Sequence, residues 1–186
     1  MNISFDLDNT LIPNGSSFAV EPIGRIARLL GIEELRKGTR DLVSELKSRG
    51  YEIHIYTTSF RSRLSIRLMF LYYGIRVNRI INQSLNQRQL KKLRINCSKY
   101  PPAFGFDIHI DDSKGVGIEG ERLNFRSIII EPDDYKWHET VLKKNNELYN
   151  ITSPLFPHTF RYNFQQVAIG VVKVKRVVIS RPGFFM

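Results

Sequence analysis

The chain has 186 residues, of which 42% are hydrophobic and 25% charged, as is typical of a single soluble domain with a sizeable core. A single cysteine, Cys97, excludes an intramolecular disulfide framework and a cysteine-rich metal site. Because there is no basic leader and no apolar run of about 18 residues, we expect a cytoplasmic protein that does not enter a membrane.

The net charge of +10 is concentrated in two segments of the chain. Residues 60–100 contain ten Lys or Arg and no acid, and residues 151–186 contain five Lys or Arg and no acid. The ordinary interpretation is a solvated basic face. The alternative is attraction of an anionic partner, either a phosphorylated small molecule or a nucleic acid.

Strands and helices alternate in the first third of the chain. Ile3 to Phe5 predicts a short buried strand that ends at two carboxylates, Asp6 and Asp8. Two helices follow, over residues 21–31 and 38–50. Their apolar residues at helical spacing are Ile23, Ile26, Ala27 and Leu30 in the first and Leu42, Val43 and Leu46 in the second. Residues 52–56 alternate as a strand that ends at Thr57.

The middle of the chain repeats this alternation. Residues 60–73 predict a basic amphipathic helix whose inward residues are mostly Leu64, Leu68, Met69, Leu71 and Tyr72. Residues 82–98 are polar and lack strong periodicity. Further strands are predicted over residues 76–81, 106–110 and 127–130. A last helix is predicted over residues 134–148, with Trp137 and Val141 inward.

Strands separated by helices predict an α/β fold with a parallel sheet and right-handed crossovers. The strand ends that carry Asp6, Thr57 and Asp111 then meet at one edge of the sheet, where ligands bind in such folds. Asp6 and Asp8 point the same way if the strand continues, and two close like charges need a cation or a proton between them. An Asx-type turn is the alternative for these residues.

The run Asp6-Leu7-Asp8-Asn9-Thr10 resembles the first motif of the haloacid dehalogenase (HAD) superfamily, Asp-x-Asp-x-Thr after the first strand. The superfamily has three further signals, in order: a Thr or Ser after a second strand, a Lys, and an acidic pair after a later strand. Thr57, Lys99 and Asp111-Asp112 are candidates for them. The resemblance covers residues 1–135.

The resemblance implies a Rossmann-like three-layer sandwich with strand order 5-4-1-2-3. Only about 48 residues separate Asp8 from Thr57, which is too few for a helical cap domain, so a capless member is expected. Any lid would come from the flap after the first motif, from the C-terminal segment, or from a partner subunit of a homo-oligomer. We expect a catalytic domain over residues 1–150 and an extension over residues 151–186, with one or two strands within 167–179.

The resemblance also implies roles for the acidic residues. Asp6 is the expected nucleophile that forms an aspartyl-phosphate, and Asp8 the general acid and then the general base. An anionic nucleophile that attacks a phosphate dianion needs a cation, and Mg²⁺ suits oxygen ligands. The expected Mg²⁺ ligands are the Asp6 carboxylate, the Asp8 main-chain carbonyl, Asp111 and Asp112.

Two further residues are expected to bind the phosphoryl group. Thr57 is the first residue after the apolar run and would donate a hydrogen bond to a phosphoryl oxygen, although Thr58 is a neighbouring alternative. Lys99 would offset the charge of Asp6 and of the substrate, with Lys91 and Lys92 as rivals in the same basic stretch.

Together these residues predict a Mg²⁺-dependent phosphatase that acts on a phosphorylated substrate. A phosphotransferase and a nucleic-acid end phosphatase are the enzymatic alternatives, because an open site and a basic segment suit a large anionic substrate. A non-catalytic binding protein with the same fold is the alternative from another class.

Overall fold

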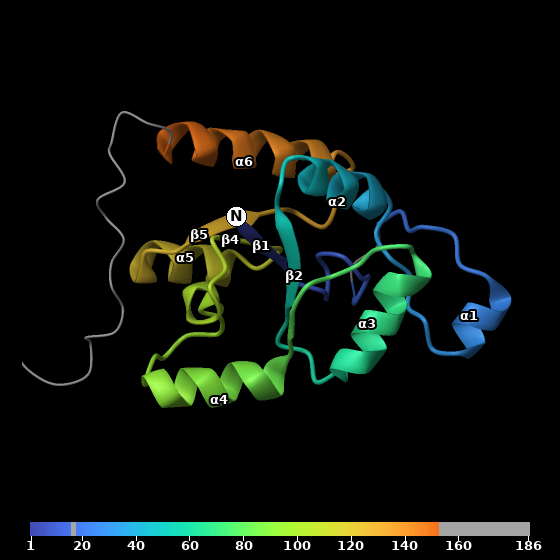
Figure 1. Cartoon of the computed structure of the whole chain (residues 1–186), viewed down its shortest axis with the longest axis horizontal. Coiled ribbons are helices and arrows are strands. Elements are labelled where there is room, and N and C mark those ends of the chain that lie inside the picture. The colour runs from blue at the N-terminus through green and yellow to red at the C-terminus, as the bar shows by residue number, and fades with distance from the viewer. Residues whose placement is uncertain (16–17, 153–186) are drawn as a thin grey trace, which may run out of the picture. The chain divides into compact units, whose positions relative to one another are not determined.

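A computed structural model describes residues 1–15 and 18–152. Its five strands are parallel and form one sheet in the order β3-β2-β1-β4-β5 (Figure 1). They are β1 (Asn2–Phe5), β2 (Glu52–Tyr56), β3 (Ile80–Ile81), β4 (Ile108–Asp111) and β5 (Arg126–Ile129). The predicted parallel α/β fold and its strand order are therefore confirmed, and β1 lies at the centre of the sheet.

Helices connect the strands along the chain. They are α1 (Arg25–Leu29), α2 (Thr39–Ser48), α3 (Arg63–Tyr72), α4 (Gln83–Leu93), a 3₁₀ helix (Pro101–Phe104), α5 (Lys114–Leu123) and α6 (Trp137–Thr152). The helix α4 occupies the stretch without clear periodicity, and it begins where the Asn82 side chain accepts a hydrogen bond from Leu85 N. None of the helices in the described part of the chain is long and apolar enough to cross a bilayer.

Both faces of the sheet are covered, because alternate strand residues point to opposite faces. The main core cluster packs strand residues against α2, α3 and α6, which contribute Leu46, Phe70 and Val141 in turn. A smaller cluster holds Tyr56 of β2 against Leu85 of α4. The two clusters are the two interfaces of a three-layer sandwich. The extension predicted over residues 151–186, including its strands within 167–179, lies outside the described residues, apart from the end of α6.

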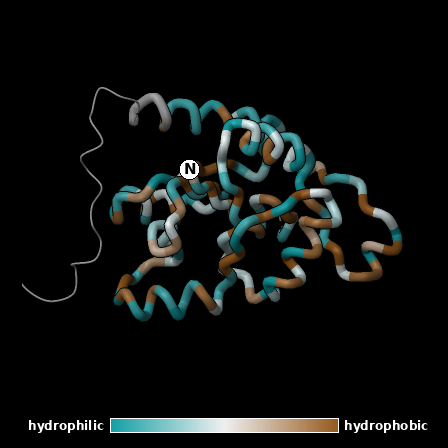
Figure 2. The backbone as a smooth tube through the Cα atoms, viewed as in Figure 1, coloured by the Kyte–Doolittle hydropathy of each residue, from teal (hydrophilic) through white to brown (hydrophobic). Residues whose placement is uncertain are grey.

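Two helices differ from their sequence predictions, the first in length and the second in its inward residues. The helix predicted over residues 21–31 is only five residues long, and hydrophobic residues are interleaved with hydrophilic ones along this segment (Figure 2). Ile26 and the adjoining Leu30 are 76% and 75% exposed, while Ala27 is buried. In α3 the inward residues are Ile66, Met69 and Phe70. The residues Leu64, Leu68, Leu71 and Tyr72 are exposed instead. Because α1 has a single turn, only one of its residues reaches the core.

Close helix packing makes Gly120 of α5 sensitive to substitution. A Cβ atom there would lie 2.9 Å from Ser127 Oγ and 3.0 Å from the Phe125 carbonyl oxygen. We expect Gly120→Ala to lower the free energy of unfolding by about 1–3 kcal/mol, measured by urea denaturation. Gly115→Ala in the same helix is the control, since its Cβ would meet only Ser113 Oγ, at 3.3 Å. Equal stability of the two variants would contradict the close approach at Gly120.

Candidate active site

The turn after β1 places the two carboxylates of the first motif among different partners. Leu11 N and Ile12 N both donate to Leu7 O at 2.8 Å, and Asn9 adopts a left-handed φ of 59°. The strand ends at Phe5, so the condition under which Asp6 and Asp8 are expected to point the same way, a strand that continues to Asp8, is not met. The expectation that both side chains point the same way assumed a longer strand.

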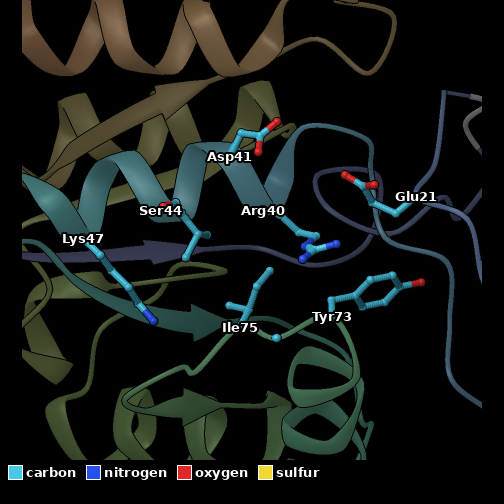
Figure 3. A pocket seen from close by; sticks show the side chains of 9 residues that line it. Glu21, Arg40, Asp41, Ser44, Lys47, Tyr73 and Ile75 are labelled. Carbon is cyan, nitrogen blue, oxygen red and sulfur yellow. The ribbon is translucent and has the colours of Figure 1, made fainter.

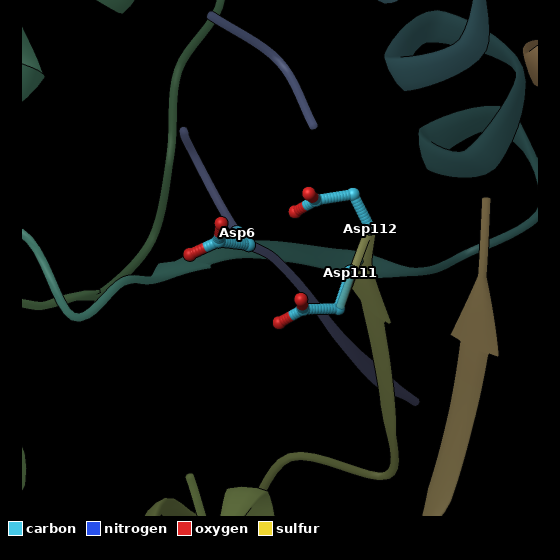
Figure 4. Close-up of side chains that lie close together, drawn as sticks. All are labelled: Asp6, Asp111 and Asp112. Atoms are coloured by element: carbon cyan, nitrogen blue, oxygen red, sulfur yellow. The ribbon is translucent and has the colours of Figure 1, made fainter. Parts of the chain in front are cut away.

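An acidic cluster lies where β1 and β4 end. Asp6, Asp111 and Asp112 each offer one carboxylate oxygen within 4.8 Å of the others (Figure 4). Asp111 is the last residue of β4, and Asp112 accepts a hydrogen bond of 3.1 Å from Thr10 Oγ1. The cluster thus joins two neighbouring strand ends, as the convergence of parallel strands predicts.

Lys99 is the cation of this cluster. Its Nζ lies 2.6 Å from Asp6 Oδ1 and 2.6 Å from Asp111 Oδ2, and its side chain is buried. Glu119 of α5 fixes the preceding loop, since its carboxylate accepts hydrogen bonds from Ser98 N at 2.7 Å and from Lys99 N at 3.3 Å. Lys91 and Lys92 are exposed on the last turn of α4, so the structure places Lys99, and neither of them, at the cluster.

His109 supports Asp111 from below the cluster. It lies two residues earlier on β4, so its side chain projects from the same face of the sheet. His109 Nε2 is 2.9 Å from Asp111 Oδ2, His109 Nδ1 is 2.9 Å from Ser4 Oγ, and Asp111 Oδ1 accepts from Ser113 N at 2.9 Å. The Asp111 carboxylate is therefore held by Lys99, His109 and a main-chain amide.

These neighbours set the protonation of the cluster. Burial raises the pKa of Asp6 to about 6, against the lowering effect of Lys99. Burial also opposes ionisation of Asp111, but the Lys99 charge and the His109 hydrogen bond outweigh it and lower the pKa of Asp111. For Lys99, burial would lower the pKa, but the two carboxylates raise it. At neutral pH two buried carboxylates therefore share one ammonium, which leaves an excess negative charge.

Asp8 has its own cation. Arg61 Nη1 lies 2.8 Å from Asp8 Oδ1 and 3.0 Å from Asp8 Oδ2, and Asn14 Nδ2 is 3.3 Å from Asp8 Oδ1. The Asp8 side chain is 24% exposed, so it is reachable from solvent. A carboxylate with this access to solvent can exchange protons with water and with a bound substrate.

Thr57 lies at the end of β2, beside the central strand. Its main-chain N donates to Ile81 O at 2.9 Å, and its Oγ1 accepts from Ser59 N at 3.1 Å. Thr57 is buried, whereas Thr58 is exposed. Since its oxygen is occupied as an acceptor, the hydroxyl proton is what Thr57 can offer to a phosphoryl oxygen.

The acidic cluster has the chemistry of a magnesium site. Its three carboxylates are hard oxygen donors, and they carry more negative charge than Lys99 neutralises. Asp6 Oδ1 is buried and lies 2.6 Å from Lys99 Nζ, the same ammonium that Asp111 contacts. A divalent cation would balance the remaining negative charge of the three carboxylates, so the residues present fit Mg²⁺.

Three residues around the cluster are not among the candidates from the sequence. His109 carries a usable signal, its two-residue spacing from Asp111 on a strand. Arg61 and Glu33 carry none, because one lies in a basic stretch and the other in the segment before α2. Arg61 reaches Glu33 through two bonds of 2.7 Å.

A separate cavity of about 430 Å³ lies beside α2 (Figure 3). Arg40, Asp41, Ser44 and Lys47 of α2 line one side, and Glu21, Tyr73 and Ile75 line the other. Its lining includes no member of the acidic cluster. This cavity is therefore distinct from the candidate active site.

No protein-family model matches the chain, and no curated protein matches it. Among solved structures, the chain is similar to a HAD-superfamily hydrolase, subfamily IA, from Geobacter sulfurreducens PCA, with 12% identity over 69% of this chain and 88% of that one and a TM-score of 0.45. It is also similar to a predicted HAD-like family hydrolase from Porphyromonas gingivalis, with 13% identity over 77% of this chain and 97% of that one and a TM-score of 0.44. A third similar structure is a mutant of CbbY from Rhodobacter sphaeroides in complex with xylulose-1,5-bisphosphate, with 15% identity over 70% of this chain and 85% of that one and a TM-score of 0.40. At such low identities, we argue the function from the residues of the site.

Proposed function

We propose that the chain is a Mg²⁺-dependent phosphomonoester hydrolase of the HAD type. The observation that carries the proposal is the buried Lys99 between Asp6 and Asp111, with Asp112 beside them. Such a cluster offers a nucleophilic carboxylate, fixed positive charge and oxygen ligands for a metal at one strand edge. A purely structural ion pair does not need the third carboxylate.

The proposed reaction has two steps on this chain's own residues. In the first, an Asp6 oxygen forms a bond to phosphorus, the bond from phosphorus to the leaving oxygen breaks, and Asp8 gives its proton to that oxygen. In the second, Asp8 takes a proton from water as the water oxygen attacks phosphorus, and phosphate leaves with the Asp6 carboxylate restored. Thr57 and Lys99 bind the phosphoryl oxygens throughout.

Asp6, Asp111, Asp112 and the Asp8 main-chain carbonyl would hold the Mg²⁺. When bound, the metal neutralises charge between the Asp6 carboxylate and the phosphoryl oxygens. This role explains why the cluster keeps more carboxylates than Lys99 can balance.

The test of this proposal is hydrolysis of p-nitrophenyl phosphate by the unaltered chain with Mg²⁺ and with EDTA. We expect turnover with Mg²⁺ and none with EDTA. Acid-quenched samples should carry phosphate on the peptide that contains Asp6. Equal turnover in EDTA, or phosphate on another peptide, would contradict the mechanism. A lack of turnover on a broad panel of phosphoesters would favour a non-catalytic binding protein.

A nucleic-acid end phosphatase is the second candidate, and one feature of the surface favours it. A groove of about 520 Å³ is lined by Arg63 and Arg67 of α3 and by Arg79 before β3. Ile81 also lines it, and the Ile81 carbonyl oxygen accepts the hydrogen bond from Thr57 N. The backbone phosphates of a nucleic-acid strand whose terminal phosphate is bound at Asp6 could therefore contact these arginines.

Salt dependence distinguishes the two candidates. If three phosphates of a single strand contact the arginine groove, log(kcat/KM) for an end-phosphorylated oligonucleotide should fall with log[salt] with a slope of about −2. Arg63→Gln should reduce this slope by about one third. The same measurements with p-nitrophenyl phosphate are the reference, and an oligonucleotide slope no steeper than that of the aryl ester would argue against nucleic acid.

A further inference from the structure

Two ion pairs that share Arg61 link Asp8 to the segment before α2. The Arg61 guanidinium meets Glu33 with two parallel bonds, from Nε to Oε2 and from Nη2 to Oε1, both of 2.7 Å. Its remaining nitrogen, Nη1, bonds both oxygens of Asp8 and also Ser59 Oγ, at 2.8 Å. One edge of the guanidinium is thus anchored to Glu33, and the other is presented to Asp8.

The main chains of Arg61 and Glu33 are each held by further hydrogen bonds. The Arg61 main chain is held on both sides, because Arg61 N donates to Ser59 Oγ and Arg61 O accepts from Asn82 Nδ2, each at 3.1 Å. Glu33 O accepts from the buried Tyr73 Oη at 3.0 Å. The guanidinium therefore has a defined position before it meets Asp8, as a paired fork geometry favours.

We propose that Arg61 is a positioning residue that orients Asp8 for proton transfer to the leaving oxygen, and that Glu33 orients Arg61. The proposal rests on the proposed function. Asp8 lies within the tight turn after β1 and is partly exposed, so its rotamer needs an external partner if proton transfer is to have a fixed geometry. A protonated carboxyl keeps an accepting oxygen, so one bond from Nη1 survives while the other oxygen carries the proton.

A role in stability alone does not account for the arrangement. The side chains of Asp8, Arg61 and Glu33 are 24%, 26% and 34% exposed, and ion pairs with this access to water contribute little to folding. These ion pairs instead connect to Asp8, the carboxylate that must donate and accept protons in the proposed reaction. The segment before α2 therefore influences Asp8 through the contact of Glu33 with Arg61.

The test exploits leaving groups of different basicity. Nitrophenolate is a good leaving group without protonation, whereas an alkoxide must be protonated as it leaves. Misplacing Asp8 should therefore strongly slow hydrolysis of the alkyl ester only. We expect Arg61→Gln to lower kcat/KM for an alkyl phosphate at least about tenfold more than for p-nitrophenyl phosphate. Glu33→Gln should give the same pattern with a smaller ratio, and it carries the test if Arg61→Gln fails to fold in a thermal melt.

The matched control is Arg28→Gln, which removes the neighbouring exposed ion pair of Arg28 with Glu34. It changes the net charge by the same amount as Arg61→Gln, in the segment that carries Glu33, and should leave the hydrolysis of both esters unchanged. In an Asp8→Asn background, Arg61→Gln should cause no further change in the alkyl-to-aryl ratio. A uniform loss on both esters, or an additive loss in that background, would overturn the role of Arg61. If the unaltered chain hydrolyses neither ester, that result would instead argue against the proposed function.

Discussion

Asp6→Asn is expected to abolish Mg²⁺-dependent hydrolysis, by at least about 10³-fold, and to stabilise the metal-free protein. An amide keeps the shape of the side chain but cannot act as the carboxylate nucleophile. Stability should rise because burial makes the ionised Asp6 unfavourable, as its pKa of about 6 shows. Removal of this carboxylate leaves Asp111 as the single carboxylate that contacts Lys99, at 2.6 Å.

The sign of the effect of pH follows from the raised pKa. Asp6 is neutral in both the folded and the unfolded chain below its unfolded value of 3.8, so it costs nothing there. As pH rises from 3.8 to about 6, the unfolded chain loses this proton while the folded chain still holds it, so folding becomes less favourable. The stability gain from Asp6→Asn should therefore be absent near pH 3.5 and reach the order of 1–3 kcal/mol above about pH 7.

Urea denaturation in EDTA across this pH range measures the gain. Asp133→Asn is the control, because Asp133 is an exposed carboxylate outside the cluster. Added Mg²⁺ should stabilise the unaltered chain more than Asp6→Asn, since the variant lacks one ligand. A variant that is less stable than the unaltered chain in EDTA at every pH would show that the Asp6 charge is fully compensated in the fold.

The positions of the acidic residues could be predicted from the sequence because they depend on local features. Asp6, Thr57 and Asp111 each follow a short apolar run, and parallel strands bring such ends to one edge. The identity of the lysine could not be predicted in this way, because Lys91 and Lys99 both lie in a basic stretch. What separates them is the hydrogen bond that Lys99 N donates to the Glu119 carboxylate, a contact across twenty residues.

The orientation of α3 could not be predicted for a different reason. The helix carries two apolar stripes at helical spacing, one through Ile66, Met69 and Phe70 and the other through Leu64, Leu68 and Leu71. Periodicity shows that both stripes exist but not which one faces the sheet. The pairing of Arg61 with Asp8 is equally invisible, since it depends on the end of β1 at Phe5 and on the loop after β2.

Lys99→Met is expected to cause the largest loss of stability of any single change in the site, about 3–5 kcal/mol. The substitution leaves the buried carboxylates of Asp6 and Asp111 close together without their shared cation. Lys91→Met is the control, because Lys91 is exposed on α4 and should change stability by less than about 0.5 kcal/mol. Urea denaturation in EDTA at pH 8 gives both values.

The loss from Lys99→Met should depend on pH and on Asp6. Lys99 lowers the pKa of Asp6, so without it Asp6 takes up a proton at a higher pH, and the repulsion with Asp111 fades as pH falls. The deficit should therefore be smaller at pH 5 than at pH 8. The double variant Asp6→Asn with Lys99→Met should recover part of the stability at pH 8, because a single carboxylate can rely on His109 and Ser113 N. If the double variant is no more stable than Lys99→Met, then Lys99 stabilises the fold by packing, and balance of charge between Asp6 and Asp111 is not its role.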